Sequence, residues 1–340
     1  MKRLEVVIVL PFVLVAGCEQ GDISSGASSS NMSSQELQVF IKKVKSTLVF
    51  VEGGEFLMGD YGLQYGPEKL PYDSDKDSKP LHKVHLSNYS ISKYKITNEE
   101  FQFYLRRNGL ALRQDAGEDF KAISEMPTTP AHLDWFEAEK YCAWLSNISA
   151  LPFGLPTEAQ WEYAARSRGQ FLMVATDDGT YKATDDDVTE DWADGPKGIN
   201  ISSSWDRKIF AKEMGWKTDT FTPLPVDRFP PNPLGLYSMS DNGYEWVKDW
   251  YDPTYYEYST PNDPQGPNLP VYKDPSSNNK YAKVLRGKDY ADPSWGGGVN
   301  VHRGYRNPDG AMSSISGRGE FLVLENKTAR CVVNYPRPIK

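Results

Sequence analysis

Apolar and polar positions follow a helical period in four parts of the chain. Between residues 35 and 45, apolar side chains recur at the i, i+3, i+4, i+7 spacing of one helix face: Leu37, Phe40, Ile41 and Val44. Three further helices are predicted where a capping residue is followed three positions later by Glu or Gln, at Thr97, near Asp134 and at Thr157. Apolar residues at helical spacing follow each of these three starts.

Short alternating segments predict strands at Val49–Val51, His82–Ile91 and Val284–Arg286. From Gly169 to Asn232 the sequence has no period, and a compact domain rarely contains so long a segment without regular structure. We therefore expect something further to hold this segment in place. Because no repeat and no clear linker occurs between residues 47 and 340, we expect that part of the chain to form one domain.

Residues 1–18 have the pattern of a bacterial lipoprotein signal peptide. Lys2 and Arg3 precede an apolar run that is too short to span a bilayer, and small residues lead from this run to Cys18. This pattern resembles a lipobox, in which the cysteine is lipidated and becomes the first mature residue. Since Glu19 rather than Asp follows, we expect attachment to the outer membrane at its periplasmic face. Residues 19–46 then form a Gly/Ser tether and the short helix, and residues 47–340 form the domain.

The composition narrows the classes of function. The 340 residues carry a formal net charge of −8, which argues against a nucleic-acid binder because such proteins need a basic face. Aromatic residues make up 13% of the chain, which a disordered protein would lack. The 27 glycines and 24 prolines indicate many turns. Together these features predict a loop-rich domain packed by aromatic rings.

Several segments occur in the order in which one protein family has them. They are Val51–Gly59, Pro80–Phe103, Pro130–Trp135, Leu155–Arg166, Pro231–Val247, Leu285–Gly287 and Ala329–Cys331. The series, over about residues 49–333, resembles the formylglycine-generating enzyme (sulfatase-modifying factor) family. This resemblance implies an α+β fold of the C-type-lectin-like kind, a single loop-rich domain with little regular secondary structure.

The resemblance also shows which chemistry is missing. Formylglycine generators bind copper(I) through two cysteines shortly after an Arg-Gly segment, here Arg286–Gly287, because soft thiolates select that ion. This chain has no cysteine between Cys142 and Cys331. We therefore expect no copper, no catalytic residue and no oxidase activity.

A second branch of the family, with iron held by histidines, provides the alternative function: an oxidase of altered chemistry. The chain has four histidines, His82, His85, His132 and His302. His82 and His85 are three positions apart on a predicted strand, so they face opposite sides. Such an enzyme would also need a polar pocket, in which Arg286, Arg303 and Arg306 could hold a carboxylate. The alternative for these three arginines is that they simply brace loops of the fold.

The two cysteines of the mature domain have two interpretations. Cys142 falls on the apolar face of a predicted helix, where a free thiol behaves as a small hydrophobic group. This favours free buried thiols for Cys142 and Cys331. A disulfide between them remains the alternative, because the periplasm is oxidising.

Two structural calcium sites are implied by the resemblance. At the first, Asn200 and Asp219 would offer side-chain oxygens, and Ile201 and Phe221 would offer carbonyl oxygens. The second set comprises Ser238, Asp241, Gly243 and Glu245. Calcium prefers such hard oxygen ligands, and the first site would hold the aperiodic segment in place.

These observations favour a non-catalytic periplasmic lipoprotein that binds a protein partner. The partner would be a secreted toxin, with this chain as the immunity protein against a lipase-type toxin of type VI secretion, or the chain would be an accessory protein of a secretion system. Aromatic loop residues are candidate contacts with the partner because binding hot spots favour such rings: Trp192, Trp205, Trp216, Tyr255, Tyr256 and Trp295. For each ring taken singly, filling the core of a loop-rich fold is an equally good interpretation.

Overall fold

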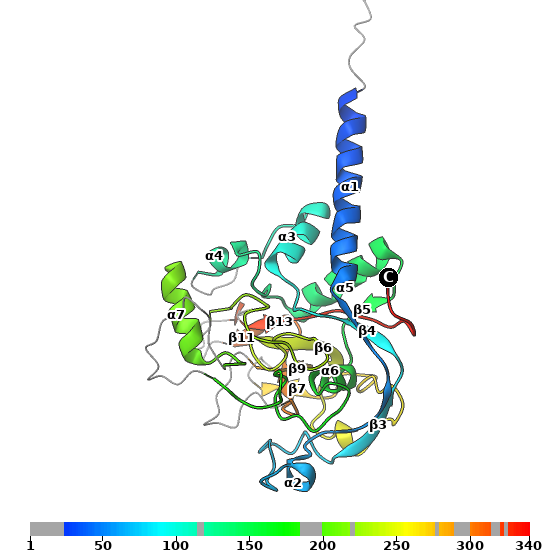
Figure 1. The fold of residues 1–340 in the computed structure, drawn as a ribbon, viewed down its shortest axis with the longest axis vertical. Helices are drawn as coiled ribbons and strands as arrows, with labels where there is room; N and C mark the ends of the chain where they lie inside the picture. The colour runs from blue at the N-terminus through cyan, green and yellow to red at the C-terminus, as the bar shows by residue number, and fades with distance from the viewer. Residues whose placement is uncertain are drawn as a thin grey trace, which may run out of the picture. The chain divides into compact units, whose positions relative to one another are not determined.

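The computed structural model describes residues 24–113, 119–183, 199–217, 222–275, 279–288, 300–313, 320–322 and 326–340. The chain divides into two compact units, Met1–Lys42 and Lys43–Lys340. The first unit contributes most of helix α1 (Ser24–Ser46), which is labelled in Figure 1. This helix begins at Ser24, inside the Gly/Ser segment that we expected to be a tether. Once a helical nucleus exists, each added residue gains a backbone hydrogen bond, so the helix extends toward the N-terminus.

The second unit contains two four-stranded sheets. One has the order β1 (Leu48–Val51), β4 (Tyr89–Ser92), β14 (Val332–Val333) and β5 (Phe153–Gly154), with antiparallel pairs throughout. The other has the order β10 (Gly304–Arg306), β9 (Lys283–Arg286), β6 (Tyr244–Trp250) and β13 (Lys327–Thr328), in which β13 runs parallel to β6. The first sheet therefore joins segments from both halves of the domain, whereas the second is built from segments of its C-terminal half.

Three two-stranded ribbons complete the strands of the described chain. They pair β2 (Gly54–Met58) with β3 (His82–Leu86), β7 (Lys273–Asp274) with β8 (Lys280–Tyr281), and β11 (Ala311–Ser313) with β12 (Glu320–Leu322). The expected strand His82–Ile91 is thus two strands, β3 and β4, which belong to different sheets. The chain changes sheet at Ser87 and Asn88, whose polar groups bind Asp263 and the backbone N–H of Gly53.

All three predicted capping sequences begin helices. Thr97 caps α3 (Asn98–Arg107), Asp134 caps α5 (Trp135–Ser149) and Thr157 caps α6 (Glu158–Ala165), each with a reciprocal capping box. The other helical segments are α2 (Gly62–Tyr65), α4 (Phe120–Glu125), α7 (Ser204–Met214) and the 3-10 turn η3 (Tyr255–Glu257). Helix α7 lies inside the segment that we expected to be aperiodic, so part of that segment is regular.

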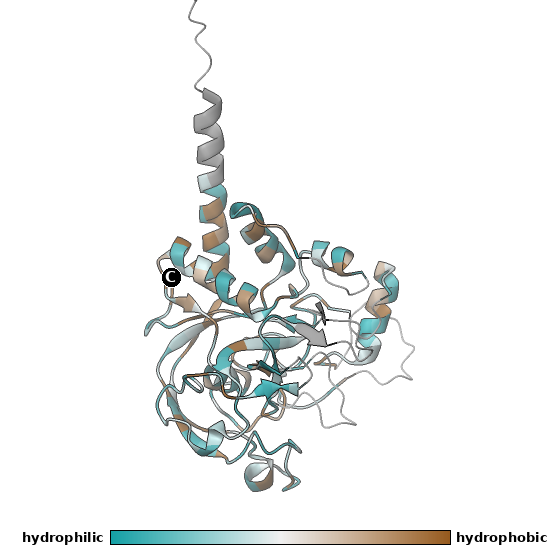
Figure 2. Ribbon diagram, turned by 180° about the vertical axis from the view of Figure 1, so that it is seen from behind, coloured by the Kyte–Doolittle hydropathy of each residue, from teal (hydrophilic) through white to brown (hydrophobic). Residues whose placement is uncertain are grey.

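Hydrophobic and hydrophilic segments are interleaved along the helices (Figure 2), and none of the described helices is long and apolar enough to cross a membrane. The main core packs Trp161 and the small residues of α6 together with residues of β3, β4 and β9, among them Val84, Ile91 and Val284. Every residue of α6 is buried, its two glutamates among them. A fully buried helix that carries charges needs partners for them, and these partners define the centre of the molecule.

Candidate functional site

The centre of the domain is an ion-pair network around the two glutamates of α6. Arg286 on β9 reaches both: its guanidinium lies 2.8 Å from Glu158 Oε1 and 2.9 Å from Glu162 Oε2. Arg303 adds two parallel hydrogen bonds to Glu158, from Nε at 2.7 Å and from Nη2 at 2.9 Å. Arg166, one turn after Glu162 on the same chain segment, binds the remaining oxygen of that residue at 2.8 Å.

Charge and burial have opposite effects on the pKa of Glu158 in this network, and the effect of charge is the larger one. Burial raises the pKa of Glu158, but the charges and hydrogen bonds of Arg303 and Arg286 outweigh burial and hold that pKa below its ordinary value. Both arginines are completely buried and engaged on these carboxylates. Arg286 and Arg303 therefore have a structural role inside the domain and are not free to hold a substrate carboxylate. The half-buried Arg306 instead lies 3.9 Å from the carboxylate of Asp274.

A second buried network surrounds Glu245, a residue of the second calcium set. Lys95 Nζ donates to Glu245 Oε1 and to the carbonyl oxygen of Gly243, both at 2.8 Å. Arg330 binds both oxygens of Glu245, at 2.7 and 2.8 Å, and Trp161 Nε1 donates to Oε2 at 3.1 Å. Burial raises the pKa of Glu245, but the charges of Arg330 and Lys95 outweigh it and bring the value to about 2.

These contacts already occupy part of the second set. Two of the four expected ligands, Gly243 and Glu245, already bind an ammonium group. Asp241 accepts a hydrogen bond from the backbone N–H of Ser202, and Ser238 donates one to the carbonyl oxygen of Val226. In this structure the residues of the second set do not fit calcium.

The first calcium set is only partly within the described chain, because Asp219 and Phe221 lie outside it. Asn200 and Ile201 are both buried. The side chain of Asn200 accepts from the backbone N–H of Lys182 and donates to Asp177 at 2.8 Å. Calcium at this set stays a prediction.

The four histidines do not come together, in agreement with the opposite facing of His82 and His85. His85 is exposed, whereas burial lowers the pKa of His82 and brings the pKa of His132 to about 3. The described residues contain one group of three side chains with metal-ligating atoms, namely Asp73, Asp75 and His302, whose ligating atoms all lie within 4.8 Å of one another. Sequence reasoning missed this group. Its sequence signal is the spacing Asp73-x-Asp75-x-Asp77, which resembles the start of a cation-binding loop.

Cys142 and Cys331 form a disulfide, with 5.8 Å between their Cα atoms. The preference for free thiols is therefore wrong and the alternative is correct. Burial on the apolar side of α5 did not decide the question, because the segment before β14 brings a second, equally buried cysteine against it. Neither sulfur is available to copper.

The candidate partner contacts separate into three kinds. Tyr255 and Tyr256 are buried in the core, and the Tyr256 hydroxyl contacts Glu158 and Arg286, so for these two rings the core interpretation is correct and partner contact is excluded. Trp205 lies on α7, and Trp216 packs edge-to-face on Phe210 with ring centroids 5.9 Å apart; both are half-buried. Trp192 and Trp295 lie outside the described residues.

Fold and site together define a loop-rich α+β domain whose central arginine–glutamate networks hold the structure together. Residues 34–317 match the family model of the sulfatase-modifying factor enzyme 1-like domain, and the chain belongs to that family. The resemblance seen in the sequence, and the fold that it implies, are thereby confirmed.

Relatives of this chain include proteins named as enzymes and one named as inactive. The chain is 28% identical over 282 residues to a formylglycine-generating enzyme of Streptomyces coelicolor, covering 71% of this chain and 78% of that enzyme. It is 27% identical over 252 residues to the inactive C-alpha-formylglycine-generating enzyme 2 of Mus musculus, covering 61% and 70%. It is 28% identical over 296 residues to the serine/threonine-protein kinase pkn1 of Chlamydia pneumoniae, which is 81% of this chain but 37% of the kinase. The family thus includes members named as inactive.

Among solved structures, PvdO from Pseudomonas aeruginosa has the same fold. The superposition has a TM-score of 0.53 and covers 85% of this chain and 94% of that one, at 21% sequence identity. At this level of identity the likeness concerns the fold alone.

Proposed function

We propose that this chain is a lipid-anchored binding protein of the periplasm, built on a formylglycine-generating-enzyme scaffold without the copper chemistry. The observation that carries the proposal is the state of the cysteines. No cysteine follows Arg286–Gly287 before Cys331, and Cys331 is bonded to Cys142. Copper(I) selects thiolates, and neither sulfur of a disulfide is a thiolate.

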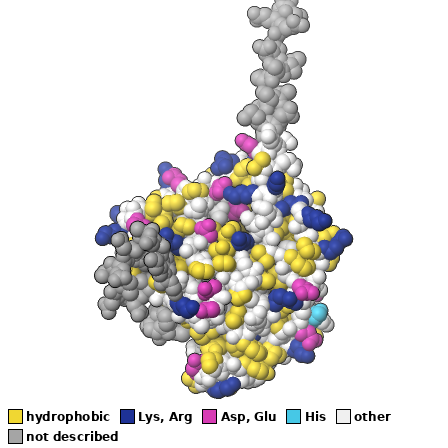
Figure 3. Space-filling view, in the orientation of Figure 1, with side chains coloured by type: hydrophobic (Ala, Val, Ile, Leu, Met, Phe, Trp, Pro, Cys, Tyr) yellow, Lys and Arg dark blue, Asp and Glu magenta, His cyan; other side chains and the backbone are white. Residues whose placement is uncertain are grey.

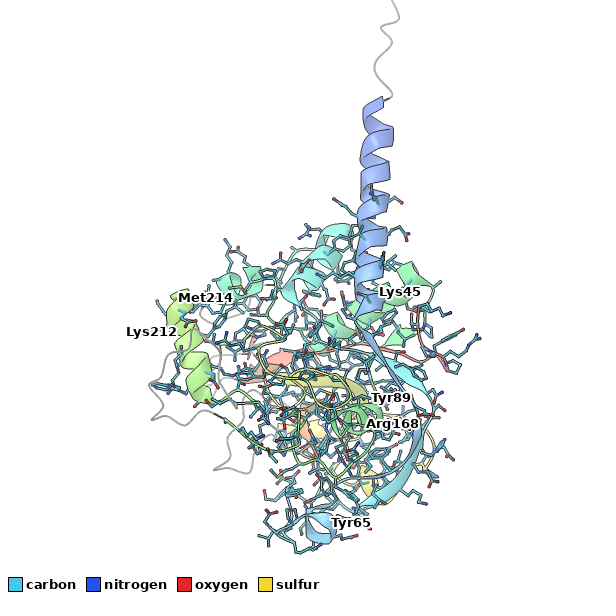
Figure 4. The ribbon with its side chains drawn as sticks, in the orientation of Figure 1. Lys45, Tyr65, Tyr89, Arg168, Lys212 and Met214 are labelled. Carbon is cyan, nitrogen blue, oxygen red and sulfur yellow. A yellow bond between two sulfur atoms is a disulfide. The ribbon has the colours of Figure 1, made fainter. Side chains whose placement is uncertain are left out.

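An exposed apolar patch supports the binding role. Leu63 and Tyr65 of α2, Leu70 and Phe171 expose between 46% and 63% of their surface, and the rings of Tyr65 and Phe171 stack with centroids 4.4 Å apart. Tyr65 is labelled at the end of the domain where α2 lies (Figure 4), and hydrophobic side chains gather at that end of the surface in Figure 3. Grouped apolar exposure of this kind is typical of surfaces that bind proteins.

The partner that we propose is a secreted toxin of the lipase type that reaches the periplasm, with this chain as its immunity protein. Cys18 carries the lipid anchor in this proposal and places the domain at the periplasmic face of the outer membrane. Calcium at Asn200, Ile201, Asp219 and Phe221 would serve the scaffold alone.

The catalytic half of the proposal is tested with a cysteine-containing sulfatase peptide. We expect no conversion of the cysteine to formylglycine when the purified chain is given copper and oxygen, because no thiolate pair is present to bind copper(I). Mass spectrometry of the peptide measures the product, and the Streptomyces coelicolor enzyme is the positive control. Turnover by this chain would contradict the proposal.

The binding half is tested with a purified lipase-type toxin of type VI secretion. Leu63→Asp places a charge in the apolar patch and should weaken binding at least about tenfold, as expected for a residue at the centre of an interface. Leu269→Asp is the matched control, since Leu269 is 73% exposed and is not part of the patch. Calorimetry measures the affinity of both variants for the toxin. If the two affinities are equal, the apolar patch is not the binding surface.

A further inference from the structure

The backbone of the loop between β2 and β3 is held by hydrogen bonds to two side chains of the same loop, Asp60 and Lys79. Asp60 accepts hydrogen bonds from the backbone N–H groups of Gly62 at 2.9 Å and of Tyr72 and Asp73 at 3.2 Å. Lys79 lies 3.3 Å from the same carboxylate and donates to the carbonyl oxygens of Asp73 and Asp75, at 2.7 and 2.6 Å. These contacts use the backbone of residues 73–75 and leave the carboxylates of Asp73 and Asp75 to other partners.

The Asp73 carboxylate is buried, and one of its oxygens has only a long contact with His302. Its side chain is 3% exposed, and its Oδ1 accepts a hydrogen bond from the backbone N–H of Asp75 at 3.0 Å. Its Oδ2 faces His302 Nδ1 at 3.4 Å and has no closer hydrogen-bond partner among the described residues. A buried carboxylate oxygen with only this long contact gains from a cation placed between it and the imidazole nitrogen.

His302 is held in place by its neighbour in the chain. Arg303 makes the two hydrogen bonds to Glu158 described above and also donates to the carbonyl oxygen of Asp77 at 2.7 Å. The same arginine therefore ties the segment that carries His302 to the loop that carries Asp73 and Asp75. The three side chains come from one rigid region, although 227 positions separate His302 from Asp75 in the sequence.

We propose that Asp73, Asp75 and His302 form a binding site for a first-row divalent transition ion of the zinc type. An imidazole nitrogen beside two carboxylates suits such ions, whereas calcium and magnesium prefer oxygen ligands throughout. Around a zinc ion with bonds of roughly 2.0–2.2 Å, ligand atoms lie roughly 3.4 Å from one another, which the Asp73–His302 spacing already meets. The exposed Asp75 has the freedom to close the remaining distance.

The charges and the ligand count fit such an ion. Asp60, Asp73 and Asp75 carry three negative charges against the one positive charge of Lys79, which leaves a net charge that a divalent cation neutralises. Three protein ligands leave coordination positions for water or for a group from a bound molecule. The site is thus of the open kind, and it stands independently of the apolar patch and of the toxin partner.

The test is zinc binding by the full chain, purified in detergent, stripped with a chelator and dialysed against micromolar zinc in the presence of excess calcium. We expect one bound zinc per chain that calcium does not displace. His302→Ala and Asp75→Asn should each weaken binding more than about 100-fold, because loss of a direct ligand exceeds the effect of an outer contact. His85→Ala removes an exposed histidine outside the group and should bind zinc as the parent does.

Cobalt substitution supplies a readout that is independent of affinity. Cobalt(II) in the parent should show visible absorption bands of a nitrogen- and oxygen-ligated ion, and His302→Ala should lose them. Thermal unfolding without metal checks that each variant is folded, and Asp75→Asn is the safer variant because Asp75 is exposed. No zinc bound by the parent, or zinc retained in full by folded His302→Ala and Asp75→Asn, would overturn the proposal.

Discussion

Asp249 on β6 is a buried carboxylate without a full counter-charge. Its Oδ2 accepts the backbone N–H of Glu158 at 2.9 Å, at the start of α6. Burial, and then the negative charge of Glu158, raise the pKa of Asp249 from 3.8 to about 7. The folded state therefore binds a proton that the unfolded chain releases near pH 4. Stability from this group is complete below about pH 4 and is lost as the pH rises through 7.

Asp249→Asn should remove this dependence, because the amide oxygen keeps the hydrogen bond and no charge is buried. At pH 8 we expect the variant to be more stable than the parent by about 4 kcal/mol, with the difference vanishing toward pH 4. Thermal unfolding across pH 4 to 8 measures the effect. Glu257→Gln, at an exposed position, is the control that removes a carboxylate without changing the core. A constant difference between parent and Asp249→Asn over this range would contradict the assignment.

At the scale of elements, the sequence identified helices by their caps better than by their periods. The capping boxes at Thr97, Asp134 and Thr157 are local, and each is present. Helix α7 also has one, from Ser203 to Asp206, but its buried face includes Asp206 and Arg207, so hydrophobic periodicity does not reveal it. The division of His82–Ile91 into β3 and β4 depends on partners that are distant in the sequence, such as Asp263, which no local pattern contains.

The disulfide ties α5 to the segment before β14 and closes a loop over a sequence separation of 189. A cross-link over so long a loop restricts the unfolded chain strongly. The double variant Cys142→Ala/Cys331→Ala should therefore lose about 2–5 kcal/mol of unfolding free energy. Urea unfolding with and without reductant measures the loss.

Reductant should lower the stability of the parent and leave the double variant unchanged. Because both cysteines are at most 1% exposed, reduction of the parent should require prior unfolding or local opening. Cys18→Ala, which removes the cysteine outside the pair, is the control and should unfold like the parent. Equal stability of parent and double variant would show that the cross-link contributes nothing.

At the scale of the whole molecule, the family fold and the absence of copper cysteines followed from the sequence, whereas the internal pairing of charges did not. Arg286, Arg303 and Glu245 were each candidates for binding a ligand, and each is instead bound by another residue of the chain. The partners come from distant segments: Lys95 and Arg330 meet at Glu245. Spacing along the chain cannot distinguish a carboxylate that awaits a cation from one that already contacts a lysine. The same limitation hid the group of Asp73, Asp75 and His302.

The lysine at Glu245 leads to a prediction about the calcium content of the molecule. Lys95 Nζ contacts two of the four atoms that would otherwise ligate an ion, so we expect at most one bound calcium, at the set that includes Asn200. Glu245→Gln should leave the calcium content unchanged, yet it should cost about 3–5 kcal/mol because Lys95 and Arg330 would remain buried without their counter-charge. Elemental analysis and urea unfolding measure the two effects separately. Asn200→Ala is the matched variant, and it should lose calcium. If Glu245→Gln instead lost a calcium ion, a metal rather than Lys95 would neutralise this carboxylate in the protein.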